Sequence, residues 1–233
     1  MIKKIVACGM LIIIVFSLAG CGNPYYRKNV IHTEYFKVFF DEKWDLAVVF
    51  ELTDLGKEQE ILVVPSHIDG WRVEKLGRQM GYGGNSKLES EKCKKLYLPY
   101  TLKYFNSGAV RGLLLDEMVI NSAEYMNNSL SQIRSKKVVT LETYSDTLFT
   151  ESDYYLKPNI YYHFNYEDSP NGGYYWIDNI AGENLYVNPE TPMREGYEFA
   201  GWYLEPECEN EWDDTFPSIE EELLLYADWK SID

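Results

Sequence analysis

Short runs of β-branched and other apolar residues return at a nearly constant interval between residues 61 and 141. The four runs occupy residues 61–65, 96–99, 118–121 and 138–141. From Leu98 to Ile120 is 22 residues, and from Ile120 to Thr140 is 20. A unit of this size cannot bury its apolar face alone and must stack on a neighbour, so the interval predicts a solenoid. The longer gap between the first two runs contains the glycine-rich residues 81–85, which we expect to form a loop insertion.

Short motifs surround these runs: VVP at 63–65, IDGWRV at 68–73, LG at 76–77, CKKL at 93–96, LP at 98–99 and AV at 109–110. Together they resemble the BspA-type leucine-rich repeats of bacterial surface proteins. The resemblance covers roughly residues 60–150, although the third and fourth runs lack the proline. It implies a short leucine-rich-repeat solenoid with Cys93 in its core. An unrelated β-rich domain is the alternative.

Two aromatic and β-branched runs precede the repeats, at residues 35–40 and 44–52, with the polar residues 41–43 between them. A short polar gap between such runs predicts a β-hairpin. The ends of a solenoid must be covered, so we assign this hairpin to a cap. Residues 34–150 are therefore expected to form one unit of cap and leucine-rich repeats.

A polar stretch and Pro158 mark a linker at residues 151–159, beyond which the sequence pattern changes. Residues 161–166 and 174–177 are typical of strands, and the Asn171-Gly172 pair between them is a strong hairpin signal. Two motifs follow, GYEFAGWY at 196–203 and LYADW at 225–229, with an acidic, proline-containing turn between them. They resemble the internalin-type B repeat, also called the Listeria–Bacteroides repeat. The resemblance implies a small, β-grasp-like B-repeat domain at residues 160–233.

Strict alternation along the first of these motifs places Tyr197, Phe199 and Tyr203 on one face of the strand and Trp202 on the other. A bulge at Gly201 would return Trp202 to the inward face, since glycine inside a strand often marks a bulge. We therefore expect the aromatic residues of this module to form its core. A sugar-stacking platform built from Trp202 or Trp176 is the alternative.

At the N-terminus, Lys3 and Lys4 precede an uncharged apolar run that ends at Leu18 and is followed by Ala19, Gly20 and Cys21. The layout is that of a secretory signal, and as a helix the run is about 21 Å long, too short for a hydrocarbon core of about 30 Å. The residues before the cysteine resemble the lipobox of bacterial lipoproteins.

This resemblance implies that residues 1–20 are a signal peptide, that Cys21 carries a diacylglycerol, and that residues 21–33 are a tether. Two acyl chains give stable anchoring, so we expect the protein at the extracytoplasmic face of the cell membrane. An uncleaved anchor, or an ordinary signal with an accidental cysteine, is the alternative.

The chain has 22 basic and 37 acidic residues, and loss of the two leader lysines leaves a net charge of −17. Such a charge excludes nucleic-acid binding through phosphates and favours cationic partners or cations. Solubility of an exported protein is a simpler explanation of the acidity.

Nothing in the sequence points to a metal, a cofactor or an enzyme. Cys93 and Cys208 lie in different expected units, and there is no CxxC, so neither a disulfide framework nor a zinc site is expected. The histidines are scattered, and no GxSxG motif is present. An acidic edge lacks the EF-hand pattern of a calcium site and is expected to be solvated; it comprises Glu205, Glu207, Glu209, Glu211, Asp213 and Asp214.

The sequence thus predicts a membrane-anchored, non-enzymatic protein that binds a protein partner through the strand face of its leucine-rich repeats. Alternate residues of the strands would point outward, although a one-residue slip exchanges the faces; these residues are Lys95, Tyr97, Glu117, Val119, Lys137 and Val139. The rival function is glycan binding by tyrosines that cluster in the sequence: Tyr154, Tyr155, Tyr161, Tyr162, Tyr174 and Tyr175.

Overall fold

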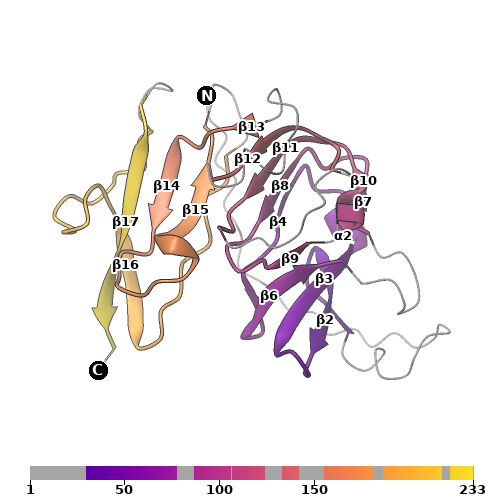
Figure 1. The fold of residues 1–233 in the computed structure, drawn as a ribbon, viewed down its shortest axis with the longest axis horizontal. Helices are drawn as coiled ribbons and strands as arrows, with labels where there is room; N and C mark the ends of the chain where they lie inside the picture. The colour runs from indigo at the N-terminus through magenta and orange to yellow at the C-terminus, as the bar shows by residue number, and fades with distance from the viewer. Residues whose placement is uncertain are drawn as a thin grey trace.

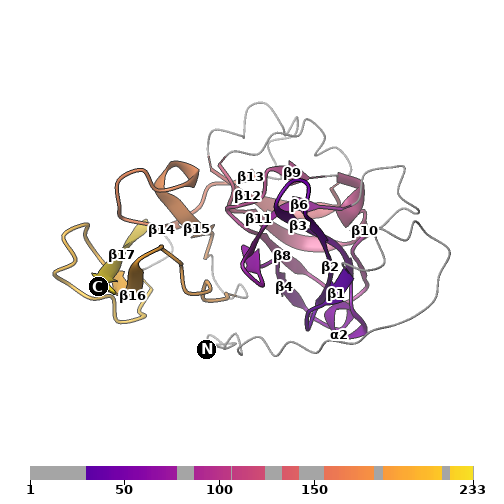
Figure 2. The same cartoon turned by 90° about the horizontal axis from the view of Figure 1, so that it is seen from below.

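The computed structural model describes residues 30–77, 87–105, 107–123, 133–141, 155–180, 186–216 and 221–232. These residues form four β-sheets and very little helix, so the mainly β class is confirmed. Figure 1 shows the sheets in two groups, with the C-terminal four-stranded sheet beside the sheets of the N-terminal part. The two groups also lie side by side when the molecule is seen from below in Figure 2.

The expected hairpin is present and opens a six-stranded mixed sheet, in which β2 pairs with β3 in antiparallel fashion. The short helix α2 (Asp54–Lys57) follows β3, and its N-cap residue Thr53 accepts a hydrogen bond from the backbone N–H of Gly56. The strands of this sheet are β1 (Val30–His32), β2 (Phe36–Asp41), β3 (Leu46–Leu52), β5 (His67–Ile68), β6 (Trp71–Leu76) and β9 (Tyr104–Phe105).

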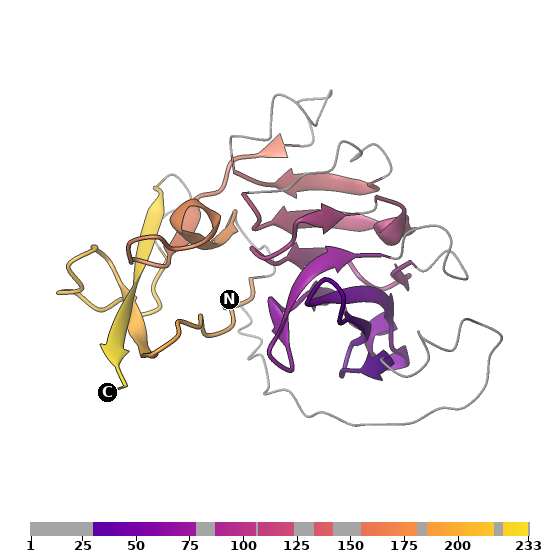
Figure 3. The same cartoon turned by 60° about the horizontal axis from the view of Figure 1, so that its bottom comes forward.

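The four runs that recur in the sequence form strands of a second sheet, in which every pairing is parallel. Its order follows the chain from β4 to β13, and Figure 3 shows the strands one above another. A fifth strand comes from the expected linker. The members are β4 (Ile61–Val63), β8 (Lys95–Leu98), β11 (Leu115–Ile120), β12 (Ser135–Val139) and β13 (Tyr155–Leu156).

One face of this parallel sheet packs on the hairpin sheet and forms the core of the N-terminal part. Leu96 and Met118 are neighbours in register and are fully buried there, together with Val49 of β3. Cys93 also belongs to this core, as the resemblance implied. The N-terminal part is therefore a packing of one sheet on another.

The expected leucine-rich-repeat solenoid is not shown, and the sheets do not together form one. A solenoid requires similar return segments between its strands, whereas here each return differs. After β4 the chain adds β5 and β6 to the hairpin sheet. After β8 it forms β9, the 3-10 turn η1 (Ser107–Val110) and β10 (Gly112–Leu113). The strand β10 pairs with β7 (Glu89–Ser90). The loop insertion expected at residues 81–85 lies outside the described residues.

The C-terminal module is a four-stranded mixed sheet of order β15-β14-β17-β16. β14 (Ile160–His163) and β15 (Tyr174–Asp178) form the predicted hairpin around the 3-10 turn η4 (Asn171–Gly173). β16 (Tyr197–Tyr203) and β17 (Leu223–Ser231) carry the two recurring motifs and pair in antiparallel fashion. The central pair, β14 and β17, is parallel although its strands come from opposite ends of the module.

The signal peptide, Cys21 and most of the expected tether lie outside the described residues, so their assignment stays a prediction. Within the described ranges, no helix is long and apolar enough to cross a membrane.

Candidate functional site

The strand face that the sequence assigned to a partner is occupied by the C-terminal module. Tyr97, Val119 and Val139 are fully buried and share a hydrophobic cluster with residues of β14 and β15. Lys95 and Glu117 are also buried, and Lys137 is exposed. These side chains do lie on the face opposite the N-terminal core, which settles the parity that the sequence left open. The face is a contact between two parts of the chain.

A buried ionic cluster lies at the centre of this contact. Lys95 Nζ lies 2.7 Å from Glu117 Oε1 and 3.1 Å from Asp178 Oδ1. The Tyr97 hydroxyl donates a hydrogen bond of 2.6 Å to Asp178 Oδ2. Burial raises the pKa of Asp178 to about 6, although the Lys95 ammonium and the Tyr97 hydrogen bond act in the opposite direction. One ammonium thus faces two carboxyl groups.

Rings and amides extend the contact on either side of the cluster. Tyr97 stacks on Trp176 with ring centroids 4.7 Å apart. Asn121 Nδ2 donates to the Leu98 carbonyl, and Asn121 Oδ1 accepts from the backbone N–H of Ile177 at 2.6 Å. The hydrogen bond from Ile177 to Asn121 therefore joins the two parts by a specific polar contact in addition to apolar packing.

The other face of the four-stranded sheet carries a line of aromatic side chains, which we call the aromatic row. It consists of Tyr174, His163, Tyr226 and Tyr203, one from each strand and paired in register across the sheet. The His163 ring lies 4.8 Å from that of Tyr174 and 5.0 Å from that of Tyr226. All four residues are half-buried, and Leu224 on the same face of β17 is exposed.

A depression of about 360 Å³ lies against the aromatic row; its lining includes His163, Tyr166, Glu167, Ser169, Gly173 and Tyr226. Asn165 Nδ2 donates hydrogen bonds to the carbonyls of Pro206 and Ala227, which ties the loop after β14 to β17. Burial lowers the pKa of His163 and so favours the neutral imidazole. The site therefore combines aromatic edges with a carboxylate and a hydroxyl.

The negative charge of the chain is concentrated in the module that carries this face. Residues 160–233 contain 18 acidic and 2 basic residues, whereas the rest of the chain contains 19 acidic and 20 basic residues. A net charge taken over the whole chain conceals this difference. Charge counted by segment is the sequence signal that would have pointed to the module.

Two carboxylates of the acidic edge at residues 205–214 accept hydrogen bonds from nearby groups of the same loop. Glu205 Oε1 accepts hydrogen bonds from the backbone N–H groups of Glu209 and Asn210, which lower the pKa of its carboxyl. Asp213 Oδ1 accepts from the backbone and hydroxyl of Thr215. No group of three or more candidate metal ligands occurs within the described ranges.

The bulge expected in β16 is confirmed. The register with β17 shifts between Phe199 and Gly201, so that Phe199 and Trp202 lie on the same face with ring centroids 5.0 Å apart. Trp202 packs in the module's core, and Trp176 is buried. Neither ring is thus an open platform for a sugar.

The clustered tyrosines are mostly structural. Tyr161, Tyr162 and Tyr175 are buried, Tyr155 and Tyr174 are half-buried, and Tyr154 lies outside the described residues. Sequence clustering therefore did not identify the aromatic row, because only Tyr174 of the cluster belongs to it. Its members are brought together by strand pairing between segments that are distant in the chain.

Both cysteines of the described residues are free. Burial raises the pKa of the Cys93 thiol to about 12. Cys208 is half-buried beside Asn165, whose Nδ2 lies 3.4 Å from its Sγ.

Comparison with protein families matches residues 162–228 to the Listeria-Bacteroides repeat domain. The match confirms the resemblance drawn from the two C-terminal motifs and covers less than a third of the chain. The BspA-type resemblance of residues 60–150 is not shown. Comparisons with curated proteins and with solved structures gave no match.

Proposed function

We propose that the chain is an exported lipoprotein that is held to the cell membrane by lipid on Cys21 and acts as a non-enzymatic binding protein. The match of residues 162–228 to the Listeria-Bacteroides repeat domain carries this proposal, because that repeat is typical of extracellular and surface proteins. The lipobox-like residues 18–21 supply the anchor. A β-grasp-like class for the module, and adhesion as the role of binding, belong to the same proposal.

The contact surface is assigned to the exposed face of the C-terminal module. The sequence favoured the strand face of residues 60–150, but Tyr97 and Val119 on that face are buried within the chain. A partner would have to displace the module to reach them. The aromatic row and its depression are open in the folded chain and so suit binding better.

Lipid anchoring is tested by Cys21→Ser, which removes the thiol that would carry the diacylglycerol. We expect the wild-type protein in the membrane fraction with fatty-acid label, and the variant in the soluble fraction without label. Equal labelling of the two proteins would refute lipidation at Cys21.

Binding is tested by using the full chain as bait against envelope and host-cell extracts. A partner retained by the wild-type chain and lost after Tyr226→Ala supports a binding function at the module face. Leu55→Ala is the control, because Leu55 is exposed on α2 in the N-terminal part. Retention of no partner by the wild-type chain would refute the binding function.

Glycan binding is the second candidate, and the aromatic lining of the depression is the observation that favours it. The burial of Trp176, Tyr162 and Tyr175 weighs against it, because these rings are not available to stack on a sugar. Retention of the chain on insoluble cell-wall glycan, with release by soluble glycan fragments, would favour this second function.

A further inference from the structure

The aromatic row lies on the face of the four-stranded sheet that is turned away from the N-terminal part. We propose that this row is the docking site for a lysine- or arginine-rich segment of a partner protein. The inference rests on the proposed binding function and specifies the chemistry of the partner.

The two central rings of the aromatic row are stacked on each other. His163 and Tyr226 are nearly parallel, with an interplanar angle of 15°, and come from adjacent strands. Side chains stand roughly perpendicular to a sheet, and adjacent strands are about 4.8 Å apart, so rings stacked in this way cover one another's faces. The row also supplies the phenol oxygens of Tyr174, Tyr226 and Tyr203, which can accept hydrogen bonds. A sugar ring stacks on an open aromatic face, so the row suits it less well.

Carboxylates flank the aromatic row. Glu167 lines the depression beside His163. Farther along β17, Asp228 pairs with Gly201 on the same face as Tyr226, and Glu211 Oε1 lies 3.4 Å from the position that a Cβ at Gly201 would occupy. In the part of the chain that the structure describes, none of these three carboxylates forms an ion pair.

The charge of the whole module matches a basic partner. With 18 acidic and 2 basic residues at positions 160–233, the module attracts cations and repels anions. Lysine and arginine heads are hydrogen-bond donors only, whereas carboxylates are acceptors and phenol oxygens accept as well as donate. A basic segment therefore complements this face in hydrogen bonding and in charge.

Outside the aromatic row, the module holds one guanidinium group of its own chain against tyrosine rings. The Arg194 guanidinium lies 3.6 Å from the ring centroid of Tyr197 and 4.4 Å from that of Tyr166. Arg194 is one of the two basic residues of the module. That contact uses ring faces, whereas a partner's cation at the aromatic row would be bound by phenol oxygens and carboxylates.

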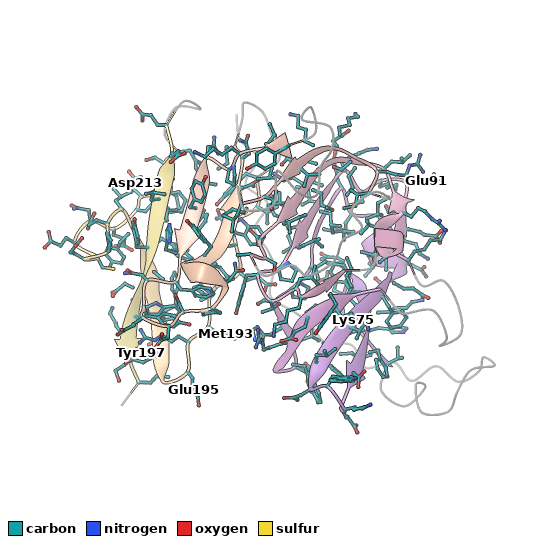
Figure 4. The ribbon with its side chains drawn as sticks, viewed as in Figure 1. Lys75, Glu91, Met193, Glu195, Tyr197 and Asp213 are labelled. Carbon is teal, nitrogen blue, oxygen red and sulfur yellow. The ribbon has the colours of Figure 1, made fainter. Side chains whose placement is uncertain are left out.

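The test is fluorescence anisotropy with the full chain and a short fluorescein-labelled peptide of alternating lysine and serine. Two variants probe the site: Tyr226→Phe removes one hydroxyl, and the double variant Glu211→Gln with Asp228→Asn removes two charges. The matched control is the double variant Glu34→Gln with Glu91→Gln, which removes two exposed carboxylates from the N-terminal part. Figure 4 shows Glu91 on the opposite side of the molecule from Tyr197 and Asp213 of the module.

We expect the peptide to bind the wild-type chain and to lose about tenfold in affinity with the Glu211 and Asp228 variant, since charge-assisted hydrogen bonds are the stronger ones. Tyr226→Phe should weaken binding by a smaller factor, and the control should change it less than twofold, by about the amount that distant screened charges contribute. A peptide of alternating glutamate and serine should not bind.

Three outcomes would overturn the inference. The lysine peptide fails to bind the wild-type chain; the control weakens binding as much as the site variant, which means attraction by net charge only; or a neutral chitin oligosaccharide binds in its place and is lost with Tyr226→Phe. If the extract experiment still retains a partner while the peptide does not bind, this inference fails and the proposed binding function stands.

Discussion

Gly201 lies where β16 changes which face its side chains occupy. Its φ of +147° is in the region that side-chain-bearing residues rarely adopt, and the register with β17 shifts next to it. The shift places Trp202 in the core and, as a consequence, turns Tyr203 toward the aromatic row. One glycine therefore determines both the packing of the module and part of its exposed face.

Gly201→Ala is expected to destabilise the chain by about 1–3 kcal/mol, because a Cβ is strained at this φ. The nearest atoms to that Cβ would be 3.4 Å away, so the cost comes from the backbone and not from a collision. Urea unfolding measures the loss, and Glu198→Ala, at an exposed position of the same strand, is the control. Equal stability of the two variants would contradict the argument.

Cys93 is expected to be unreactive in the folded protein. Its burial raises the thiol pKa to about 12, so almost no thiolate exists at pH 8. Iodoacetamide followed by peptide mapping should label Cys208 before Cys93 in the native chain, and both after denaturation. Native labelling of Cys93 at the rate of Cys208 would show that the core is open there.

At the scale of the strand, Asp178 in β15 is expected to make the free energy of unfolding depend on pH. Its folded-state pKa of about 6 lies above the ordinary value of 3.8, so between these values the folded chain holds a proton that the unfolded chain releases. Stability from this group is therefore present at low pH and is lost as pH rises through about 6. Lys95, Glu117 and Tyr97 are the groups that face it.

Asp178→Asn removes the titrating group, so stability should change less between pH 4.5 and 7.5 (about the range in which the group titrates) than in the wild-type chain. Urea midpoints at a series of pH values measure this difference. Glu198→Gln, an exposed change on β16, should leave the pH dependence of the urea midpoint as it is in the wild-type chain. If the urea midpoint of Asp178→Asn depends on pH as strongly as that of the wild-type chain, the buried carboxyl does not titrate in this pH range.

The strands could be predicted from the sequence, but their partners could not. Runs such as residues 118–120 are apolar on both faces, which is typical of a strand covered on both sides. Tyr97 is buried because Trp176 lies against it, and nothing local to either residue links the two. The aromatic row was missed for the same reason, since register between β14 and β17 joins segments about sixty residues apart.

For the whole molecule, the contact between the N-terminal part and the C-terminal module decides whether the chain unfolds in one step or two. The sequence predicts two independent units divided near residues 150–160. The shared cluster around Tyr97, Val119 and Trp176, together with the ionic cluster, couples the two parts energetically. We therefore expect a single unfolding transition for the wild-type chain.

Tyr97→Ala should separate that transition into two, because it removes the ring that stacks on Trp176 and costs about 3–5 kcal/mol at the contact. Far-UV circular dichroism reports both parts, whereas tryptophan fluorescence is dominated by the module, which holds four of the six tryptophans. The two probes should coincide in urea for the wild-type chain and diverge for the variant. Leu224→Ala, exposed on the opposite face of the module, should keep them coincident. Divergent probes in the wild-type chain would mean that the two units are independent and that the strand face of residues 60–150 is opened by separation of the module.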